Sequence, residues 1–341
     1  MSRDSYNEKN QHYIDLLNEL LKVMPRYLRD YIYDIESDML PSSRYVYVCD
    51  LKMFFDFLVE QNPMIHCYQD ISLDFLNQLT IQDFNEFLHS IRGTDNERYV
   101  SRKVSSIRKF FDYLISYRYI TNKDAYAMKN PKIRKDHQIT YMDTDEIQNF
   151  LANVDAGFSL CGKQKKHHDR TRTRDLAMLS LMLGTGIRVS ECTGLDLDDV
   201  DLERRSIHII RKGKKESDIY FSETVKTYLE PYIMQRKLME DVADKDANAL
   251  FISSKKTRIT PRAVQNLVKK YASPDVVGTK KITPHKLRSS YGTALYEATG
   301  DISIVADVLG HESVDTTRKF YSQVTEQRKR RAGDVDILLK E

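Results

Sequence analysis

One predicted helix start near the end of the chain carries two side chains that suit an anionic group. In "TPHKLRSS" (283–290), Thr283 can cap a helix and Pro284 fits its first turn. His285 and Arg288, three residues apart, then lie on one face of that helix. An imidazole and a guanidinium close to a helix N-terminus favour binding of an anion such as phosphate. The alternative for this pair is an incidental arrangement on the surface.

Two further segments place a cation beside a turn. In "LGTGIRVSE" (183–191), an apolar helix ends in a Gly-Thr-Gly run and Arg188 follows closely. The run is not a nucleotide-binding motif, because the rest of the glycine pattern and a preceding strand are missing. A capped helix end with an exposed arginine is the plain alternative, in which Glu191 could orient the arginine from behind. Lys212 lies in the turn "RKGKK" (211–215), where lysines are common and usually idle.

The stretch "LGHESVDTTRKFY" (309–321) places a histidine ten residues before a tyrosine. Neither residue is informative alone, because the chain has 21 tyrosines and 9 histidines. The order of residue types along the chain is informative: an arginine, a hairpin lysine, a His-x-x-Arg pair, a Gly-His histidine and a tyrosine. The residues are Arg188, Lys212, His285, Arg288, His311 and Tyr321.

This ordered set resembles the active site of the tyrosine recombinases, the phage integrase family. The resemblance covers almost the whole chain, since "SRKVSSIRKFFDYL" (101–114) is similar to the end of that family's core DNA-binding domain. It implies transesterification at a DNA phosphodiester, with Tyr321 forming a 3′-phosphotyrosyl bond. Arg188 and Arg288 would bind the non-bridging phosphate oxygens, and Lys212 would protonate the departing 5′ oxygen.

The resemblance gives the two histidines supporting roles. His285 would act as a base toward Tyr321 or as a further hydrogen-bond donor, and His311 would bind the phosphate. Because a phosphotyrosyl bond conserves the energy of the cleaved bond, we expect neither a metal nor a nucleotide cofactor. The sequence has no carboxylate cluster spaced for Mg²⁺ and no Walker-type loop.

More narrowly, the chain resembles the Xer recombinases that work as one protein instead of a pair. The similarity rests on "LLKVMPRYLRDYI" (20–32), on a basic insert before "RDLAMLSLMLGTGIR" (174–188), on "RKGKK" (211–215), and on "ITPHKLRSSYGTALYEATG" (282–300). Ser289 stands where a histidine is common, and the interval from histidine to tyrosine is ten where many members have nine. That branch implies resolution of chromosome dimers, with an integrase or excisionase of a mobile element as the alternative.

The C-terminal "RKRRAGDVDILLKE" (328–341) ends in too few apolar residues to form a core of its own. In the family that the chain resembles, such a tail docks onto the neighbouring subunit, which implies a homotetramer on two double-stranded DNA sites. A tail folded back on its own domain is the alternative. Two rival functions are a DNA-binding regulator without catalysis and a type IB topoisomerase, and the tail argues against the latter. A DNA translocase as activating partner is left open.

The elements that must position these residues are mainly helical. Apolar residues recur at helical spacing in five early segments, with Ser42 or Ser43 as a cap of the third and Thr80 and Asp83 as a capping box of the fourth. The segments are 13–24, 27–35, 42–60, 79–91 and 101–120. Pro131 and the polar run around it predict a linker. We therefore expect an all-helical core DNA-binding domain over 1–130, a linker over 131–140, and a catalytic domain with a docking tail over 141–341.

Charge is distributed unevenly along the chain. Residues 1–100 hold 9 Lys and Arg against 17 Asp and Glu, whereas residues 101–135 hold 10 cations against two acids. The helix over 101–120 has an apolar face from Val104 to Leu114, and we place four cations on its opposite face as candidate DNA-binding residues. They are Arg102, Lys103, Arg108 and Lys109. A solvated helix face is the alternative.

The second domain is predicted to be mostly helical with one small antiparallel sheet. A helix begins at Thr144, and "SIHII" (206–210) and "SDIYF" (217–221) form a short hairpin. After that helix, "CGKQKKHHDRTRTR" (161–174) is interpreted as a basic loop in which the adjacent pair His167 and His168 faces solvent and binds no metal. The fold class is therefore mainly α, an all-helical domain followed by a mixed α/β domain, as the tyrosine recombinase resemblance also implies.

Composition excludes several classes of protein. No apolar run reaches the roughly 20 residues of a membrane span, and the first residues, "MSRDSYNEKN" (1–10), are unlike a signal peptide. The four cysteines show no CxxC or other metal-like spacing and are interpreted as reduced thiols. We therefore expect a cytoplasmic protein without a membrane partner.

Overall fold

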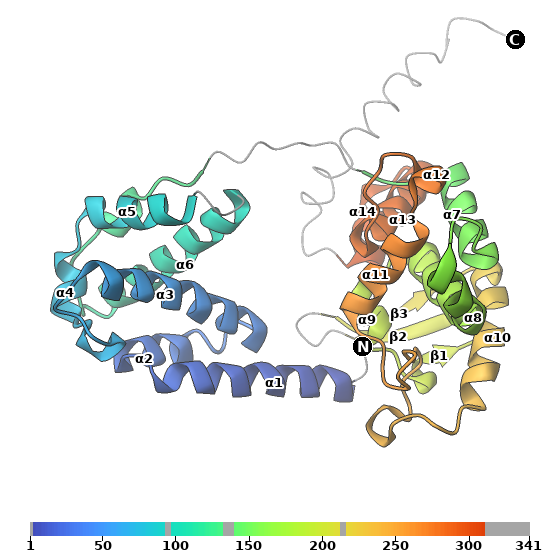
Figure 1. Ribbon diagram of the computed structural model, residues 1–341, viewed down its shortest axis with the longest axis horizontal. Coiled ribbons are helices and arrows are strands. Elements are labelled where there is room, and N and C mark those ends of the chain that lie inside the picture. The colour runs from blue at the N-terminus through green and yellow to red at the C-terminus, as the bar shows by residue number, and fades with distance from the viewer. Residues whose placement is uncertain (1–2, 93–96, 132–139, 212–215, 311–341) are drawn as a thin grey trace, which may run out of the picture. The chain divides into compact units, whose positions relative to one another are not determined.

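The chain divides into two compact units in the computed structural model (Figure 1). Residues 7–136 form one, called here the N-terminal unit, and residues 137–341 form the other, the C-terminal unit, to which residues 1–6 are also assigned. The structure describes residues 3–92, 97–131, 140–211 and 216–310. The functional assignment of the two units as a DNA-binding and a catalytic domain stays a prediction.

The described residues of the N-terminal unit form helices and connecting turns, with no strand among them. Its helices are α1 (Arg3–Lys22), α2 (Arg26–Asp34), α3 (Pro41–Gln61), α4 (Leu73–Gln78), α5 (Ile81–Arg92) and α6 (Glu97–Ser116), with short 3₁₀ turns η1 (Tyr68–Asp70) and η2 (Asp124–Ala127). Five of the helices were predicted, and α4, a short helix capped by Ser72, was missed. At the predicted capping box, the Asp83 carboxylate accepts hydrogen bonds from the Thr80 backbone N–H at 2.7 Å and from the Thr80 hydroxyl at 2.8 Å, which is one half of such a box. Helix α3 begins after Leu40 without the predicted serine cap.

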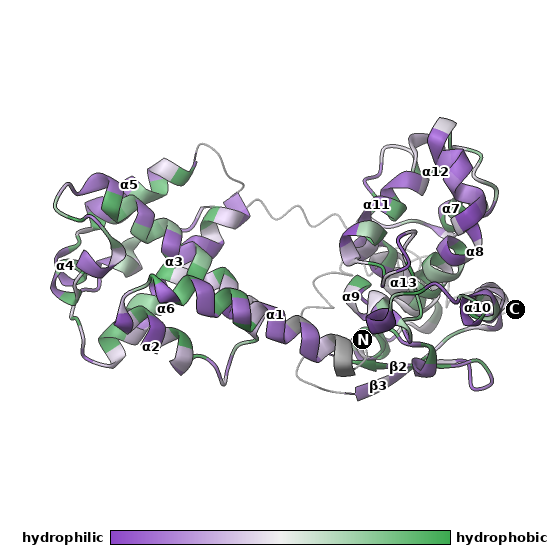
Figure 2. Ribbon diagram, turned by 60° about the horizontal axis from the view of Figure 1, so that its bottom comes forward, coloured by the Kyte–Doolittle hydropathy of each residue, from purple (hydrophilic) through white to green (hydrophobic). Residues whose placement is uncertain are grey.

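Aromatic side chains fill the centre of the N-terminal unit. Phe54 and Phe55 of α3, Phe84 of α5, and Phe110 and Phe111 of α6 are all fully buried. The predicted apolar face of α6 is confirmed, because Val104, Ile107, Phe111 and Leu114 lie in the same core. In Figure 2 these helices alternate hydrophobic and hydrophilic residues, as expected for helices with one buried face. Helices α3 and α6 therefore pack side by side along an aromatic core.

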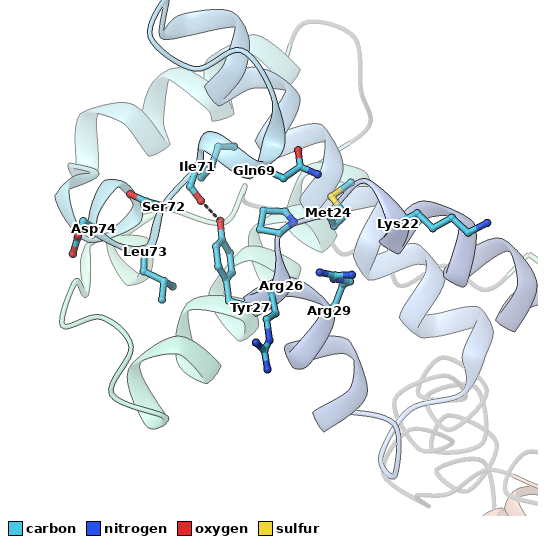
Figure 3. Close-up of a pocket in the computed structure, with 11 residues that line it drawn as sticks. Lys22, Met24, Arg26, Tyr27, Arg29, Gln69, Ile71, Ser72, Leu73 and Asp74 are labelled. Carbon is cyan, nitrogen blue, oxygen red and sulfur yellow. Dashed lines mark hydrogen bonds between the residues drawn. The ribbon is translucent and has the colours of Figure 1, made fainter.

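A pocket of about 470 Å³ lies in the N-terminal unit at the connection between α1 and α2 (Figure 3). Tyr27 donates a hydrogen bond from its hydroxyl to the carbonyl of Ile71 at 2.6 Å, which ties α2 to the turn before α4. Lys22, Arg26 and Arg29 are among the residues that line it. No residue of this pocket belongs to the candidate site residues predicted from the sequence.

The C-terminal unit is built around one long helix. Its helices are α7 (Thr144–Ala156), α8 (Gly162–Thr185), α9 (Val189–Thr193), α10 (Glu223–Lys237), α11 (Pro261–Tyr271), α12 (Pro274–Val277), α13 (Pro284–Thr299) and α14 (Ile302–Leu309), with 3₁₀ turns η3 (Leu197–Asp199) and η4 (Asp244–Asp246). Residues 175–183 of α8 are buried on all sides, since α7, α10 and α13 pack around them. The apolar run in the sequence thus becomes the central helix of the domain (Figure 1).

A small antiparallel sheet completes this unit. Its strands are β1 (Val200–Asp201), β2 (Ser206–Ile210) and β3 (Glu216–Tyr220), in that order. The predicted hairpin is confirmed, with Ile207 opposite Ile219 and Ile210 opposite Glu216. The two-residue strand β1 was too short to be recognised from the sequence.

The basic segment before the central helix corrects one prediction. Residues 162–174 are not a loop but the first turns of α8. His167 is exposed as expected, whereas His168 is buried and its Nε2 lies 2.9 Å from the carbonyl oxygen of Val154. The polar composition concealed the helix because only this one side chain of the segment turns fully inward. Among the described residues, no helix is both long and apolar enough to cross a membrane.

Candidate active site and nucleic-acid interface

Arg188 is positioned by the sharp end of the central helix. Helix α8 ends at Gly186, which adopts the left-handed conformation with φ of 64°. A Cβ on Gly186 would lie 2.5 Å from Cδ1 of Tyr291 and 2.8 Å from Cδ2 of Leu309. Only glycine fits this turn, both for its backbone conformation and for the space around it. Arg188 then precedes α9 and projects from the turn.

Glu191 orients Arg188 from within the protein. The Glu191 carboxylate accepts a hydrogen bond from the Arg188 backbone N–H at 2.7 Å and another from Nη1 at 2.9 Å. Glu191 is buried, whereas 39% of the Arg188 side chain is exposed. Nη2 of Arg188 donates to the carbonyl of Gly310 at 3.0 Å. The orienting role considered for Glu191 is therefore present, and the guanidinium reaches the end of α14.

Arg288 arrives at the same place from α13. Pro284 begins the helix as predicted, and Arg288 follows after one turn. Thr283 occupies the N-cap position, but its side chain makes no capping hydrogen bond. Its Nη1 donates to the carbonyl of Gly186 at 2.6 Å, and its Nη2 donates to the carbonyl of Leu309. The side chain is only 6% exposed. A buried guanidinium is thus held between the end of α8 and the end of α14.

His285 lies one turn before Arg288, on the solvent side of α13. Partial desolvation of the ring lowers the pKa of His285, and the positive charges of Lys286 and Arg288 lower it further. Arg188 adds a smaller effect on this pKa in the same direction. The imidazole is therefore neutral at pH 7 and able to accept a proton.

Arg211 is a residue of this site that the sequence analysis missed. It follows β2 directly, and its Nη1 and Nη2 donate to the carbonyls of Asp307 at 3.2 Å and Val308 at 2.8 Å. Burial lowers the pKa of Arg211, although nearby Glu191 opposes this. Its position next to Lys212 is the one sequence feature that could have indicated a role in the site. A cation in a basic turn is too common to distinguish a functional residue.

Three arginines therefore converge on the last turn of α14. We call Arg188, Arg211 and Arg288 the arginine cluster. Together they donate hydrogen bonds to the carbonyl oxygens of four consecutive residues, 307 to 310. The negative end of the helix dipole favours cations at this end of a helix. The cluster brings together positive charge from the ends of α8 and β2 and from α13.

Three predicted site residues lie outside the described residues: Lys212, His311 and Tyr321. The residues that precede the first two in the chain are Arg211 and Gly310, and both belong to the contacts of the arginine cluster. The C-terminal segment 328–341 also lies outside the described residues. Of the six predicted catalytic residues, the structure thus describes Arg188, His285 and Arg288.

The predicted basic face of α6 needs correction. Arg102 and Lys109 are exposed, and Lys109 Nζ lies 5.4 Å from the centre of the Tyr47 ring. Lys103, expected on the same face, is only 1% exposed and its Nζ lies 3.3 Å from a carboxylate oxygen of Asp50. Arg108 is partly buried, and its guanidinium donates to backbone carbonyls after the helix, those of Tyr126 and Met128.

The reason lies in helix geometry. Successive residues of a helix point about 100° apart, so neighbours in sequence do not share a face. Lys103 lies one turn before the buried Ile107 and therefore on the apolar face of α6, whereas Arg102 lies outside that face. Arg102 and Lys109 therefore remain as candidate DNA contacts, and Lys103 is an internal partner of Asp50.

Comparisons with known proteins agree with the geometry. The phage integrase family matches residues 140–328. Tyrosine recombinase XerS of Lactococcus lactis subsp. cremoris (strain MG1363) is 28% identical, covering 94% of this chain and 98% of the relative. Tyrosine recombinase XerC of Caldanaerobacter subterraneus subsp. tengcongensis is 29% identical, covering 88% of this chain and 83% of the relative. XerH site-specific recombinase, solved as a pre-cleavage complex with its difH substrate, shares the fold with a TM-score of 0.62 at 19% identity, over 88% of this chain and 82% of that one.

Proposed function

This chain belongs to the phage integrase family and is a site-specific DNA recombinase of the tyrosine type, and we propose that it acts in the manner of the Xer recombinases. The relatives XerS and XerC match it over most of their length. The proposed reaction cuts one DNA strand through a 3′-phosphotyrosyl bond at Tyr321 and rejoins it to another 5′ hydroxyl. The observation that carries this proposal is the arginine cluster with a neutral histidine beside it.

We assign the phosphate to the solvent side of Arg188 and to Arg288. In the transition state, negative charge accumulates on the non-bridging oxygens, and guanidinium groups already fixed in place stabilise it without reorganisation. Glu191 holds the guanidinium of Arg188 in place. The carbonyls of Gly186 and Leu309 hold that of Arg288. Each arginine is therefore held from behind before any phosphate arrives.

The proton transfers are assigned to the remaining residues. The lowered pKa of His285 supports a base that takes the proton of Tyr321, whose phenol is a weak nucleophile at neutral pH. Lys212 is proposed as the general acid for the 5′ oxygen, and His311 as a donor to the phosphate. The support for these two assignments is their position in the sequence, next to Arg211 and Gly310 of the site.

The biological role is proposed from the relatives. The names of the relatives support an Xer-type recombinase. From the resemblance to that branch we propose resolution of chromosome dimers, with a part in chromosome partition and cell division, by a cytoplasmic homotetramer on two duplex sites. The tail at 328–341 is proposed to join the subunits, and a DNA translocase is a further candidate partner. An integrase of a mobile element has no stronger support among these relatives.

A trapping experiment tests the catalytic proposal. Tyr321→Phe protein, expressed in the native cells and crosslinked, recovers the genomic duplex that the protein binds. The same duplex, nicked next to the cleavage point, then traps the wild-type enzyme as a covalent adduct that resists SDS. We expect the adduct with wild type and none with Tyr321→Phe. Binding without any adduct would indicate a non-catalytic regulator.

Two labelled duplexes separate the remaining candidates. A recombinase exchanges strands between them, whereas a type IB topoisomerase relaxes supercoiled DNA and leaves the labels unexchanged. A plasmid with two directly repeated copies of the recovered site should be resolved into two circles if the protein acts like Xer. Recombination only between two different sites would instead indicate an integrase.

A further inference from the structure

A carboxylate is buried between α3 and α6 in the N-terminal unit, and it holds an exposed arginine. Asp50 of α3 is only 1% exposed. It accepts hydrogen bonds from three residues of α6: Arg102 Nη2 at 2.8 Å, Lys103 Nζ at 3.3 Å and Ser106 Oγ at 2.9 Å. A buried carboxylate needs such donors to offset its loss of water. Asp50 therefore fixes the first turns of α6 to α3.

The charges of this cluster do not cancel. One carboxylate faces two cations, so the group formed by Asp50, Arg102 and Lys103 carries one surplus positive charge. The Tyr99 ring stabilises this surplus, with its centre 4.1 Å from Lys103 Nζ and 5.0 Å from Arg102 Cζ. Lys103 is buried, but 43% of the Arg102 side chain is exposed. The surplus charge is thus presented to solvent by Arg102.

The contact with Asp50 also gives Arg102 a defined orientation. A free surface arginine samples many rotamers, and ordering them costs binding energy. Nη2 of Arg102 already donates a hydrogen bond to Asp50, so the planar guanidinium is held in one orientation before a ligand binds. A diffuse phosphate contact gains little from such rigidity. A bidentate contact to the O6 and N7 acceptors of guanine depends on it.

The surroundings of Arg102 suit a helix in the major groove. Lys109, seven residues further on the same helix, lies over the Tyr47 ring of α3. At 1.5 Å per residue the two exposed cations are about 10 Å apart along α6, a length that fits the major groove. Both are steadied by a residue of α3, one by a carboxylate and the other by an aromatic ring.

We propose that Arg102 reads a guanine in the major groove of the target duplex and that Asp50 is the positioning residue that sets this specificity. The inference rests on the proposed function, because it takes the recombination site as its ligand. It assigns base recognition to one residue of the N-terminal unit. The other candidate cation of α6, Lys109, is assigned to the phosphate backbone.

The test measures base preference, not affinity alone. The probe is the genomic duplex recovered with Tyr321→Phe, remade as a set in which each base pair is replaced singly. Wild type should lose about 10-fold or more in affinity when one particular guanine is replaced. Arg102→Lys keeps the charge but lacks the fork, and should lose this preference at that same position. Asp50→Asn should lose it too, although the new amide keeps nearly the same shape as the carboxylate.

Matched variants separate specificity from stability and charge. Lys109→Ala removes an exposed cation of the same helix that is steadied by a ring and not by Asp50, and should weaken all duplexes equally. Asp50→Asn alone leaves Lys103 buried beside a neutral amide and lowers stability. The double variant with Asp50→Asn and Lys103→Met removes both buried charges, so it should recover thermal stability and still lack the guanine preference.

Two results would overturn the inference. If Arg102→Lys keeps every base preference, or weakens all duplexes equally, Arg102 contacts phosphate or solvent only. If the double variant regains both stability and the guanine preference, Asp50 has a purely structural role. The covalent adduct at Tyr321 is measured separately with the nicked duplex. Loss of the guanine assignment therefore does not contradict the proposed catalysis, and absence of the adduct does not contradict the guanine assignment.

Discussion

At the scale of single residues, the site depends on how a buried guanidinium is satisfied. Arg288 is almost fully covered, yet a charge removed from water is tolerated only when its donors find acceptors. The carbonyls of Gly186 and Leu309 provide them. A guanidinium has five N–H donors, enough to hold two backbone carbonyls and a phosphate oxygen at once. The same bonds that stabilise the fold therefore prepare the group for catalysis.

Arg288→Ala should abolish most cleavage while leaving DNA binding largely intact. Loss of one fixed donor to a charged transition state typically costs about 10²- to 10³-fold in rate. Single-turnover cleavage of the nicked duplex measures the rate, and a gel-shift assay measures binding. Arg288→Lys is the control, because it keeps the charge and should retain part of the rate. An equal loss of binding and cleavage would contradict the assignment of Arg288 to the transition state.

The pH dependence of cleavage should report His285. Its pKa is lowered below the ordinary value of about 6.5, so the imidazole stays neutral as the pH falls through that value. If neutral His285 accepts the tyrosine proton, the cleavage rate should decline in acidic buffer, and the midpoint of that decline should lie below the ordinary value of about 6.5. His285→Gln removes the titrating group and should give a slower rate without this acidic decline. A decline that is unchanged in His285→Gln would assign it to another group.

At the scale of elements, α14 ends where the arginine cluster begins. Gly310 closes the helix in the left-handed conformation with φ of 60°. A Cβ there would lie 1.7 Å from Nη1 of Arg211, far inside any possible contact. Arg211 could move away only by giving up its bonds to the carbonyls of Asp307 and Val308. The position of Arg211, next to Lys212, therefore requires a glycine at position 310, next to His311.

Gly310→Ala should consequently lower both thermal stability and the cleavage rate. The left-handed backbone alone costs about 1–2 kcal/mol for a residue with a side chain. Gly162 provides a control, because its φ is 51° and a Cβ there meets nothing within 4 Å. Gly162→Ala should cost stability without affecting cleavage at a temperature where both variants are folded. Similar cleavage rates in the two variants would mean that the contact between Gly310 and Arg211 has no effect on the site.

The sequence predicted elements better than it predicted which side chains turn inward. Strong apolar periodicity identified the long helices, and the Gly-Thr-Gly run marked the end of α8 where Arg188 projects. The burial of Lys103 was missed because its partner, Asp50, lies 53 residues away in the sequence. The polar start of α8 was missed because His168 turns inward toward Val154, a residue of another helix. Arg211 was missed for the same reason, since its role depends on α14. Such pairings arise only from the tertiary fold.

At the scale of the whole molecule, the charge distribution predicts how binding responds to salt. Residues 1–100 carry a net charge of −8 and residues 101–135 a net charge of +8, so we expect residues 101–135 to contribute strongly to DNA affinity. Lys109→Ala should lower the slope of log affinity against log salt by about 0.9, the effect of one phosphate contact. Lys103→Met removes a buried, paired cation of the same helix and should leave the slope unchanged. A shift in the slope for both variants would show that Lys103 also contacts DNA.

Assembly of several subunits on DNA is expected to depend on the C-terminal segment. The segment 334–341 carries Val335, Ile337, Leu338 and Leu339, whose apolar surface is too small to fold alone and gains stability only against another surface. If that surface belongs to a neighbouring subunit, removing 334–341 should leave binding to a single site unchanged and prevent two sites from pairing. Light scattering with duplex DNA measures the assembly, and Leu338→Asp offers a full-length variant with the same expected defect. Normal pairing by the truncated protein would place the tail on its own domain. Loss of single-site binding would instead assign the tail to the fold of the subunit, since a surface needed only for docking has no part in holding one duplex.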